Sequence, residues 1–134
     1  MAEWDWIGTI DARDAMPLHA QLERSIRVAI ASHWLKPGDQ LPTVRQLAVA
    51  LRINANTVAK VYTHLERMGA LETRRGVGTF VAAPAAAVTA RHHEAREAEL
   101  RDITLRAIAD ASAHGFTAAD LRRALQALSK GASS

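Results

Sequence analysis

The sequence predicts a mainly α-helical chain with one small β-hairpin, and three observations support this fold class. Two capped, apolar-periodic segments lie close together within residues 41–68, and two short strand-like runs flank a glycine-rich turn within 70–82. A second helical pair follows a proline-containing stretch at 82–87. Helix, turn, helix and hairpin in this order predict a winged helix-turn-helix domain at 1–83, and residues 84–134 predict a short helical hairpin.

Length and composition restrict the classes of protein that this chain can represent. Its 134 residues, 49% hydrophobic and 23% charged, suit one ordinary globular domain with a compact appendage. No apolar run approaches the roughly 18–20 residues of a membrane span, and the acidic N-terminus is unlike a signal peptide. Because cysteine is absent, disulfides and thiolate metal sites are excluded, and we expect a cytoplasmic protein with no membrane partner.

The first helix is predicted from Pro17 to about His33. Proline is favoured in the first turn of a helix, and apolar residues then recur at helical spacing. These residues are Leu18, Leu22, Ile26, Ala29 and Ile30. The helix is expected to end before Pro37-Gly38, a pair that suits the two central positions of a type II turn.

Two shorter helices are predicted next by their capping residues. Thr43, followed three residues later by Gln46, has the spacing of a capping box. Asn54 is a favoured N-cap for a third helix over residues 55–68, and Gly69 ends that helix because glycine readily adopts the left-handed conformation. The apolar side of the third helix, expected in the core, consists of Val58, Val61, Tyr62, Leu65 and Met68.

The remaining residues predict a hairpin and two longer helices. Residues 70–74 and 79–82 are expected to form strands, with the turn at 76–78. Residues 88–114 and the segment from Thr117 onward each have one apolar face, made up of Leu100, Ile103, Ala107, Ala111, Leu121, Ala124, Leu125 and Leu128. Two such helices cannot bury both faces within about fifty residues, so we expect them to form the interface of a homodimer.

Several motifs occur in order between residues 17 and 81: Lys36-Pro37-Gly38-Asp39, Leu41-Pro42-Thr43 with Arg45 and Leu47-Ala48, Asn56-Thr57-Val58, Tyr62 with Leu65-Glu66, and Gly76 to Val81. With these motifs the segment resembles the N-terminal DNA-binding domain of GntR-type bacterial transcriptional regulators. The Asn-x-Asn-Thr-Val version and the short helical C-terminal part are similar to the YtrA subgroup, which implies a dimeric repressor, often encoded beside transporter genes. Two positions depart from the family pattern: Asn54-Ala55 replaces a frequent Ser-Arg, and Arg52 replaces a common glycine.

The expected function is sequence-specific binding of double-stranded operator DNA, because residues 41–81 hold six basic side chains against two acidic ones. Asn56, Thr57 and Lys60 are the expected base contacts, since residues near the start of a recognition helix meet base edges in the major groove. At the hairpin tip we expect Arg75 and Gly76 to come closest to the minor groove. The full set of candidate DNA-binding residues is Arg45, Arg52, Asn54, Asn56, Thr57, Lys60, Arg74, Arg75, Gly76, Gly78 and Thr79.

The expected mechanism is repression of the chain's own operon from a pseudo-palindromic operator with half-sites about one helical turn apart. A winged helix that binds other proteins without specific DNA contacts is the alternative. The sequence contains no phosphate-binding glycine loop, nucleophile elbow or spaced metal-ligand set, so neither catalysis, a cofactor nor a metal is expected. A small-molecule effector, which the sequence does not identify, would bind between subunits or against the N-terminal domain. Trp4 and Trp6 are expected to pack in the protein rather than to stack on a ligand.

Overall fold

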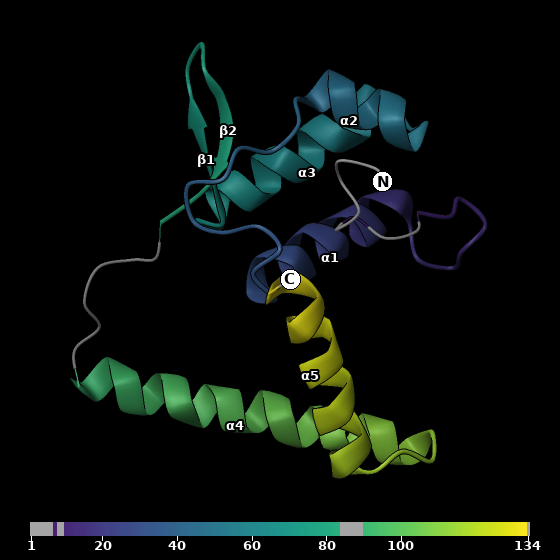
Figure 1. The fold of residues 1–134 in the computed structure, drawn as a ribbon, viewed down its shortest axis with the longest axis vertical. Helices are drawn as coiled ribbons and strands as arrows, with labels where there is room; N and C mark the ends of the chain where they lie inside the picture. The colour runs from purple at the N-terminus through teal and green to yellow at the C-terminus, as the bar shows by residue number, and fades with distance from the viewer. Residues whose placement is uncertain (1–6, 8–9, 84–89, 134) are drawn as a thin grey trace. The chain divides into compact units, whose positions relative to one another are not determined.

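The computed structural model describes residues 7, 10–83 and 90–133, and the side chains of the C-terminal helices from 93 to 129. The chain forms two compact units, Met1–Ala83 and Pro84–Ser134 (Figure 1). The first unit contains α1 (Leu18–Ala31), α2 (Val44–Leu51), α3 (Ala55–Arg67), β1 (Leu71–Arg74) and β2 (Gly78–Val81), and the second contains α4 (Ala90–Ala113) and α5 (Ala118–Ser133). The predicted mainly α-helical winged helix-turn-helix chain with C-terminal helices is confirmed. Trp4 and Trp6 lie outside the described residues.

The central helix of the first unit is α3, which packs against α1, α2 and β1. The largest fully buried side chains come from all three helices and from β2: Leu22, Ile26, Leu47, Val58, Leu65 and Val81. Because apolar residues recur every three or four positions along each helix, one face is buried and the opposite face stays polar. The polar face of α3 is therefore left for contacts outside the unit.

Met68, which was expected in the core, is instead 62% exposed. Helix α3 ends at Arg67, and Met68 occupies the capping position, with its N–H bonded to the His64 carbonyl at 3.0 Å. Gly69 follows with a φ of 82° and turns the chain into β1. Helical spacing predicts burial only while the helix continues, and α3 ends before Met68.

The predicted helix caps are present. The Thr43 hydroxyl accepts a hydrogen bond from the Gln46 N–H at 3.0 Å, and the Gln46 side-chain oxygen accepts one from the Thr43 N–H at 2.9 Å. This reciprocal pair is the capping box of α2. At the start of α3, Asn54 Oδ1 accepts a hydrogen bond from the Asn56 N–H at 2.8 Å.

Three helices end in the same hydrogen-bonded loop, in which one left-handed residue reverses the chain. After α3 and α4 this residue is Gly69 and Gly115, with φ of 82° and 84°, but after α2 it is Arg52, with φ of 58°. In each loop an N–H bonds to the carbonyl five residues earlier: Ile53 to Ala48 at 3.1 Å, Ala70 to Leu65 at 2.9 Å and Phe116 to Ala111 at 2.9 Å. An arginine in this conformation is about 1–2 kcal/mol less favourable than glycine.

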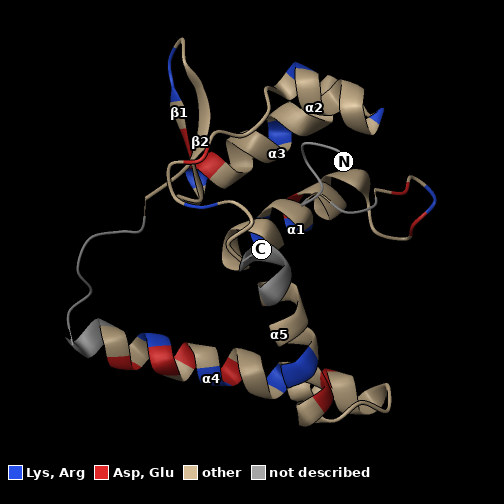
Figure 2. Cartoon of the chain, in the orientation of Figure 1, with Lys and Arg blue, Asp and Glu red and all other residues tan. Residues whose placement is uncertain are grey.

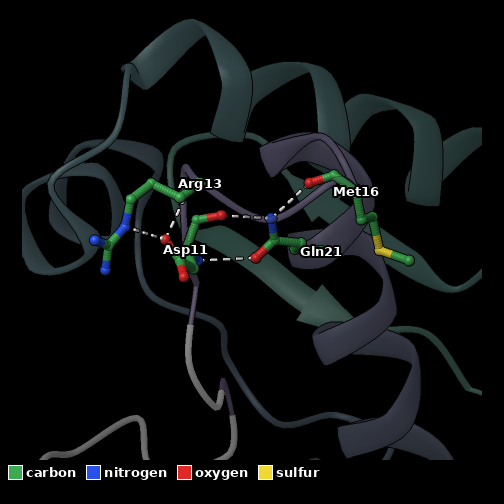
Figure 3. A network of polar contacts seen from close by, with 4 residues as sticks. All are labelled: Asp11, Arg13, Met16 and Gln21. Atoms are coloured by element: carbon green, nitrogen blue, oxygen red, sulfur yellow. Dashed lines mark hydrogen bonds and ion pairs between the residues drawn. The ribbon is translucent and has the colours of Figure 1, made fainter.

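The segment before α1 is attached to this helix by Gln21, a polar residue that is only 8% exposed. Figure 3 shows its side-chain amide donating to the carbonyls of Asp11, at 2.8 Å, and Met16, at 2.6 Å. The Gln21 side-chain oxygen accepts from the Asp11 N–H at 2.9 Å. Because these bonds pair the buried amide, its burial leaves no polar group without a partner.

The hairpin is antiparallel, with Leu71 opposite Val81 and Arg74 opposite Gly78. On the other side of β2 lies the segment 38–41, which leaves the turn at Pro37-Gly38 and in which Gln40 forms a bridge to Phe80. The sequence predicted only a turn here, at Pro37-Gly38. A bridge between residues so far apart in the chain leaves no periodic pattern in the sequence.

Within the second unit α4 and α5 contact each other, but every described side chain from 93 to 129 is exposed or half-buried. Helix α5 is capped, since the Thr117 N–H donates to Asp120 Oδ2 at 2.8 Å, and this bond holds the pKa of the Asp120 carboxyl below its usual value. The large apolar side chains that stay exposed are Leu100, Ile103, Leu105, Phe116, Leu125 and Leu128. Among the described residues no helix is long and apolar enough to cross a membrane.

Candidate nucleic-acid interface

The polar face of α3 carries the predicted base-contacting residues in its first two turns. Asn56 and Lys60 are exposed, and Thr57 is half-buried. Asn56 and Lys60 are four positions apart and therefore share one face, while Thr57 lies about 100° around the helix. The three side chains thus line the N-terminal half of a single helix.

Contacts to two neighbouring segments hold α3 in place. On its buried side, the Tyr62 hydroxyl donates to the Pro42 carbonyl at 2.7 Å, and burial raises the pKa of the phenol above its ordinary range. On its flank, His64 Nε2 lies 2.9 Å from Glu23 Oε1 of α1. A helix fixed from two sides presents its exposed residues in a defined geometry, which specific recognition requires.

The exposed basic residues of the first unit include four of the predicted DNA contacts: Arg45 and Arg52 at the two ends of α2, Lys60 on α3 and Arg75 at the hairpin tip. Figure 2 shows Lys and Arg at the ends of α2, on α3 and along the hairpin. Within the part of the chain that the structure describes, none of the four forms an ion pair with a carboxylate. Their charge is therefore uncompensated and attracts a polyanion.

Arg74 differs from its neighbour Arg75. The Arg74 guanidinium carbon lies 4.3 Å from the centroid of the Phe80 ring, and Arg74 Nε lies 3.6 Å from Glu72 Oε1. Glu72 is opposite Phe80 in the strand pairing, so alternation places all three side chains on one face of the hairpin. Arg74 thus packs on the hairpin itself, whereas Arg75 extends from its tip.

The hairpin tip is a tight turn over residues 74–77, closed by a hydrogen bond from the Val77 N–H to the Arg74 carbonyl at 2.9 Å. Gly76 occupies the third position with a φ of 76°, the conformation that a type II turn requires there. Gly78 follows with a φ of 145°. The turn that the sequence predicted at these glycines is confirmed.

A groove of about 330 Å³ separates α1 from α3, and it is lined by His19, Glu23, Thr57, Lys60, Val61 and His64. Despite the two histidines, no group of three or more His, Cys, Asp or Glu side chains among the described residues is placed to hold a metal ion. Sequence reasoning missed Glu23 as a residue that positions α3. No local motif marks it, because its partner His64 comes from another helix.

Comparison with known proteins identifies the family. Residues 18–81 match the family described as bacterial regulatory proteins, gntR family. A solved structure, YtrA from Sulfolobus acidocaldarius, a GntR-family transcription factor, is 32% identical and has a TM-score of 0.57. The match covers 77% of this chain and 98% of that chain. This chain belongs to the GntR family.

Two further proteins resemble this GntR-family chain. The HTH-type transcriptional repressor YtrA from Bacillus subtilis (strain 168) is 43% identical over 72 residues, or 54% of this chain and 55% of the repressor. A transcriptional antiterminator from Listeria monocytogenes EGD-e has a structure that is 26% identical, with a TM-score of 0.63 over 90% of this chain and 88% of its own. The chain spans about half the length of the curated relatives it matches.

Proposed function

We propose that this GntR-family protein is a sequence-specific DNA-binding transcriptional regulator that acts in the cytoplasm as a homodimeric repressor. The observation that carries the proposal is the set of four exposed cations without carboxylate partners, Arg45, Arg52, Lys60 and Arg75, around α3 and the hairpin tip. The phosphates of a DNA backbone neutralise such cations and release counterions, whereas a protein partner would have to place a carboxylate opposite each of them. The arrangement therefore favours DNA over a protein partner.

In the proposed complex α3 enters the major groove. The Asn56 amide pairs with adenine, and the Lys60 ammonium donates to guanine acceptors, with roughly 1–3 kcal/mol of discrimination for each good pair. Thr57 contacts a thymine methyl or a phosphate oxygen beside them. Asn54 contributes only its amide N–H groups, because its oxygen is engaged in the helix cap.

The other candidate residues contact the backbone and the minor groove. Arg45 and Arg52 bind phosphates from the two ends of α2, which sets the orientation of α3 without selecting a sequence. Arg75 enters the minor groove, and Gly76 allows the backbone to approach closely. Gly78 and Thr79 lie behind the tip, and Arg74 supports it through Phe80.

The proposed dimer forms through α4 and α5. Their exposed apolar side chains have no partner surface within the described part of the second unit, and a second copy related by a two-fold axis supplies one. Two α3 helices then meet half-sites of a pseudo-palindrome about one helical turn apart. The bound dimer blocks transcription of its own operon, transporter genes included, and a small-molecule effector would bind at the subunit interface or against the first unit.

The proposal is tested by selecting bound sequences from a library of random duplexes and measuring gel shifts at two salt concentrations. We expect an enriched pseudo-palindrome and an affinity that falls as salt rises. Lys60→Ala should weaken binding to the selected duplex by about tenfold or more while changing random DNA much less. Arg24→Ala removes an exposed cation of α1 outside the proposed interface and serves as the charge-matched control.

Two outcomes would contradict this function. If no sequence is enriched, or if retardation is absent even at low salt, the protein-interaction module becomes the better explanation of the fold. If Lys60→Ala weakens binding to selected and random DNA equally, Lys60 contacts phosphate and not bases.

A further inference from the structure

The hydrogen-bond ladder between residues 38–41 and β2 stops short of the hairpin tip. It contains bonds from the Gly38 N–H to the Val81 carbonyl at 2.9 Å, from the Val81 N–H to the Asp39 carbonyl at 2.8 Å, and from the Leu41 N–H to the Thr79 carbonyl at 2.8 Å. The next residue, Pro42, has no N–H, and Thr43 already caps α2. Backbone pairing therefore cannot extend from this segment to residues 77 and 78.

The side chain of Gln40 supplies the missing connection to the tip. Its Nε2 donates to the Val77 carbonyl at 3.1 Å, a contact between residues 37 positions apart in the chain. Val77 is the last residue of the turn that carries Arg75, since its own N–H closes that turn on Arg74. The bond thus holds the tip at a point two residues from Arg75.

The Gln40 side chain lies against Gly78, in space that a larger residue at position 78 would occupy. A Cβ on Gly78 would clash with the Gln40 side-chain amide, so this contact requires glycine for space as well as for its φ of 145°. On the opposite face, the Thr73 hydroxyl bonds to Glu66 of α3 at 3.0 Å. The hairpin is therefore tied to α3 through Thr73 of β1 and to residues 38–41 at its tip through Gln40.

We propose that Gln40 is a positioning residue that orders the hairpin tip so that Arg75 meets the minor groove at a fixed distance from α3. This inference rests on the DNA-binding function proposed above. An isolated two-stranded ribbon is marginally stable in water, so without Gln40 the tip beyond Thr79 samples many orientations. The protein then binds DNA more weakly, because the tip that carries Arg75 must be ordered when it binds.

The first measurement needs no DNA. Backbone ¹⁵N relaxation of the full chain should show lower order for residues 75–77 in Gln40→Met than in the native protein, because methionine keeps the length of the side chain but cannot donate to Val77. The thermal unfolding midpoint of the variant should stay close to that of the native protein, since Gln40 is exposed. Gln40→Glu, which also lacks the donor, is the second variant if the methionine variant does not fold.

The second measurement uses a duplex selected by the native protein. Gln40→Met should weaken its binding roughly two- to tenfold, the net value of one hydrogen bond, and should leave the base preference set by Lys60 unchanged. Because Gln40 acts through the tip, Gln40→Met combined with Arg75→Ala should bind no more weakly than Arg75→Ala alone.

The two measurements separate the inference from the function on which it rests. Unchanged order at 75–77 in both Gln40 variants, or additive losses in the double variant, would overturn the role of Gln40 while DNA binding by the native protein stands. A tip that loosens in Gln40→Met while the native protein binds no duplex would overturn the proposed function and, with it, the role of Gln40 in DNA binding.

Discussion

Replacing Arg52 by glycine should make the protein more stable and a weaker DNA binder at once. Arg52 is the left-handed residue after α2, at the position that Gly69 and Gly115 fill after α3 and α4. Its side chain is exposed and forms no ion pair among the described residues, so its removal costs no ion pair there. The arginine therefore adds backbone strain, and we attribute its presence to a phosphate contact.

The magnitudes follow from the conformation of the backbone and the charge of the side chain. A left-handed arginine costs about 1–2 kcal/mol, and the greater freedom of glycine in the unfolded chain offsets about 0.5–1 kcal/mol of the relief. The net gain for Arg52→Gly spans about 0–1.5 kcal/mol and centres on about 0.75 kcal/mol, which raises the unfolding midpoint by about 3–6 °C for a unit of this size. Losing one phosphate contact lowers the slope of log affinity against log salt by about one unit.

Circular dichroism melting without DNA and gel shifts at several salt concentrations measure the two effects separately. Arg52→Ala is the matched control, because alanine removes the same charge but keeps the unfavourable left-handed conformation. Both variants should lose DNA affinity equally, on selected and random duplexes alike, while only the glycine variant gains stability. An Arg52→Gly protein that melts no higher than Arg52→Ala would refute the strain argument, and one that binds DNA as the native protein does would refute the phosphate contact.

Two further predictions test the second unit and the core. Leu125→Asp places a charge in the proposed dimer interface and should yield a monomer by sedimentation equilibrium, whereas Met68→Asp, an exposed apolar position of the first unit, should remain dimeric. A dimeric Leu125→Asp protein would rule out this face. Tyr62→Phe leaves the Pro42 carbonyl without its donor and should lower the free energy of unfolding, measured in urea, by about 1–3 kcal/mol. Burial raises the pKa of Tyr62 in the folded protein, so its ionisation should not lower the free energy of unfolding below pH ~10. Above that pH the free energy of unfolding should fall by up to about 1.4 kcal/mol per pH unit, and the Phe variant should not show this loss. Tyr62 is the only tyrosine, so a pH-independent difference between the two proteins would contradict its burial as a neutral phenol.

The local features of the first unit could be predicted because their causes are local. A threonine or asparagine cap needs only the free amides of the next turn, as the bonds of Thr43 and Asn54 show. Gly69 ends α3 for an equally local reason, its tolerance of positive φ. Met68 was predicted wrongly because helical spacing holds only within the helix, and α3 ends one residue before Met68.

The sequence by itself determined the order of elements, the helix caps, the turns and the family motifs, since each depends on residues within a few positions of one another. Only the tertiary structure decided which of two adjacent arginines is available, because Arg74 is held by Phe80 and Glu72 through the strand register while Arg75 is not. It also decided that Gln40 reaches the hairpin tip and Glu23 reaches α3. Contacts between residues so distant in the chain arise from the packing of whole elements, and no local pattern of side chains encodes them.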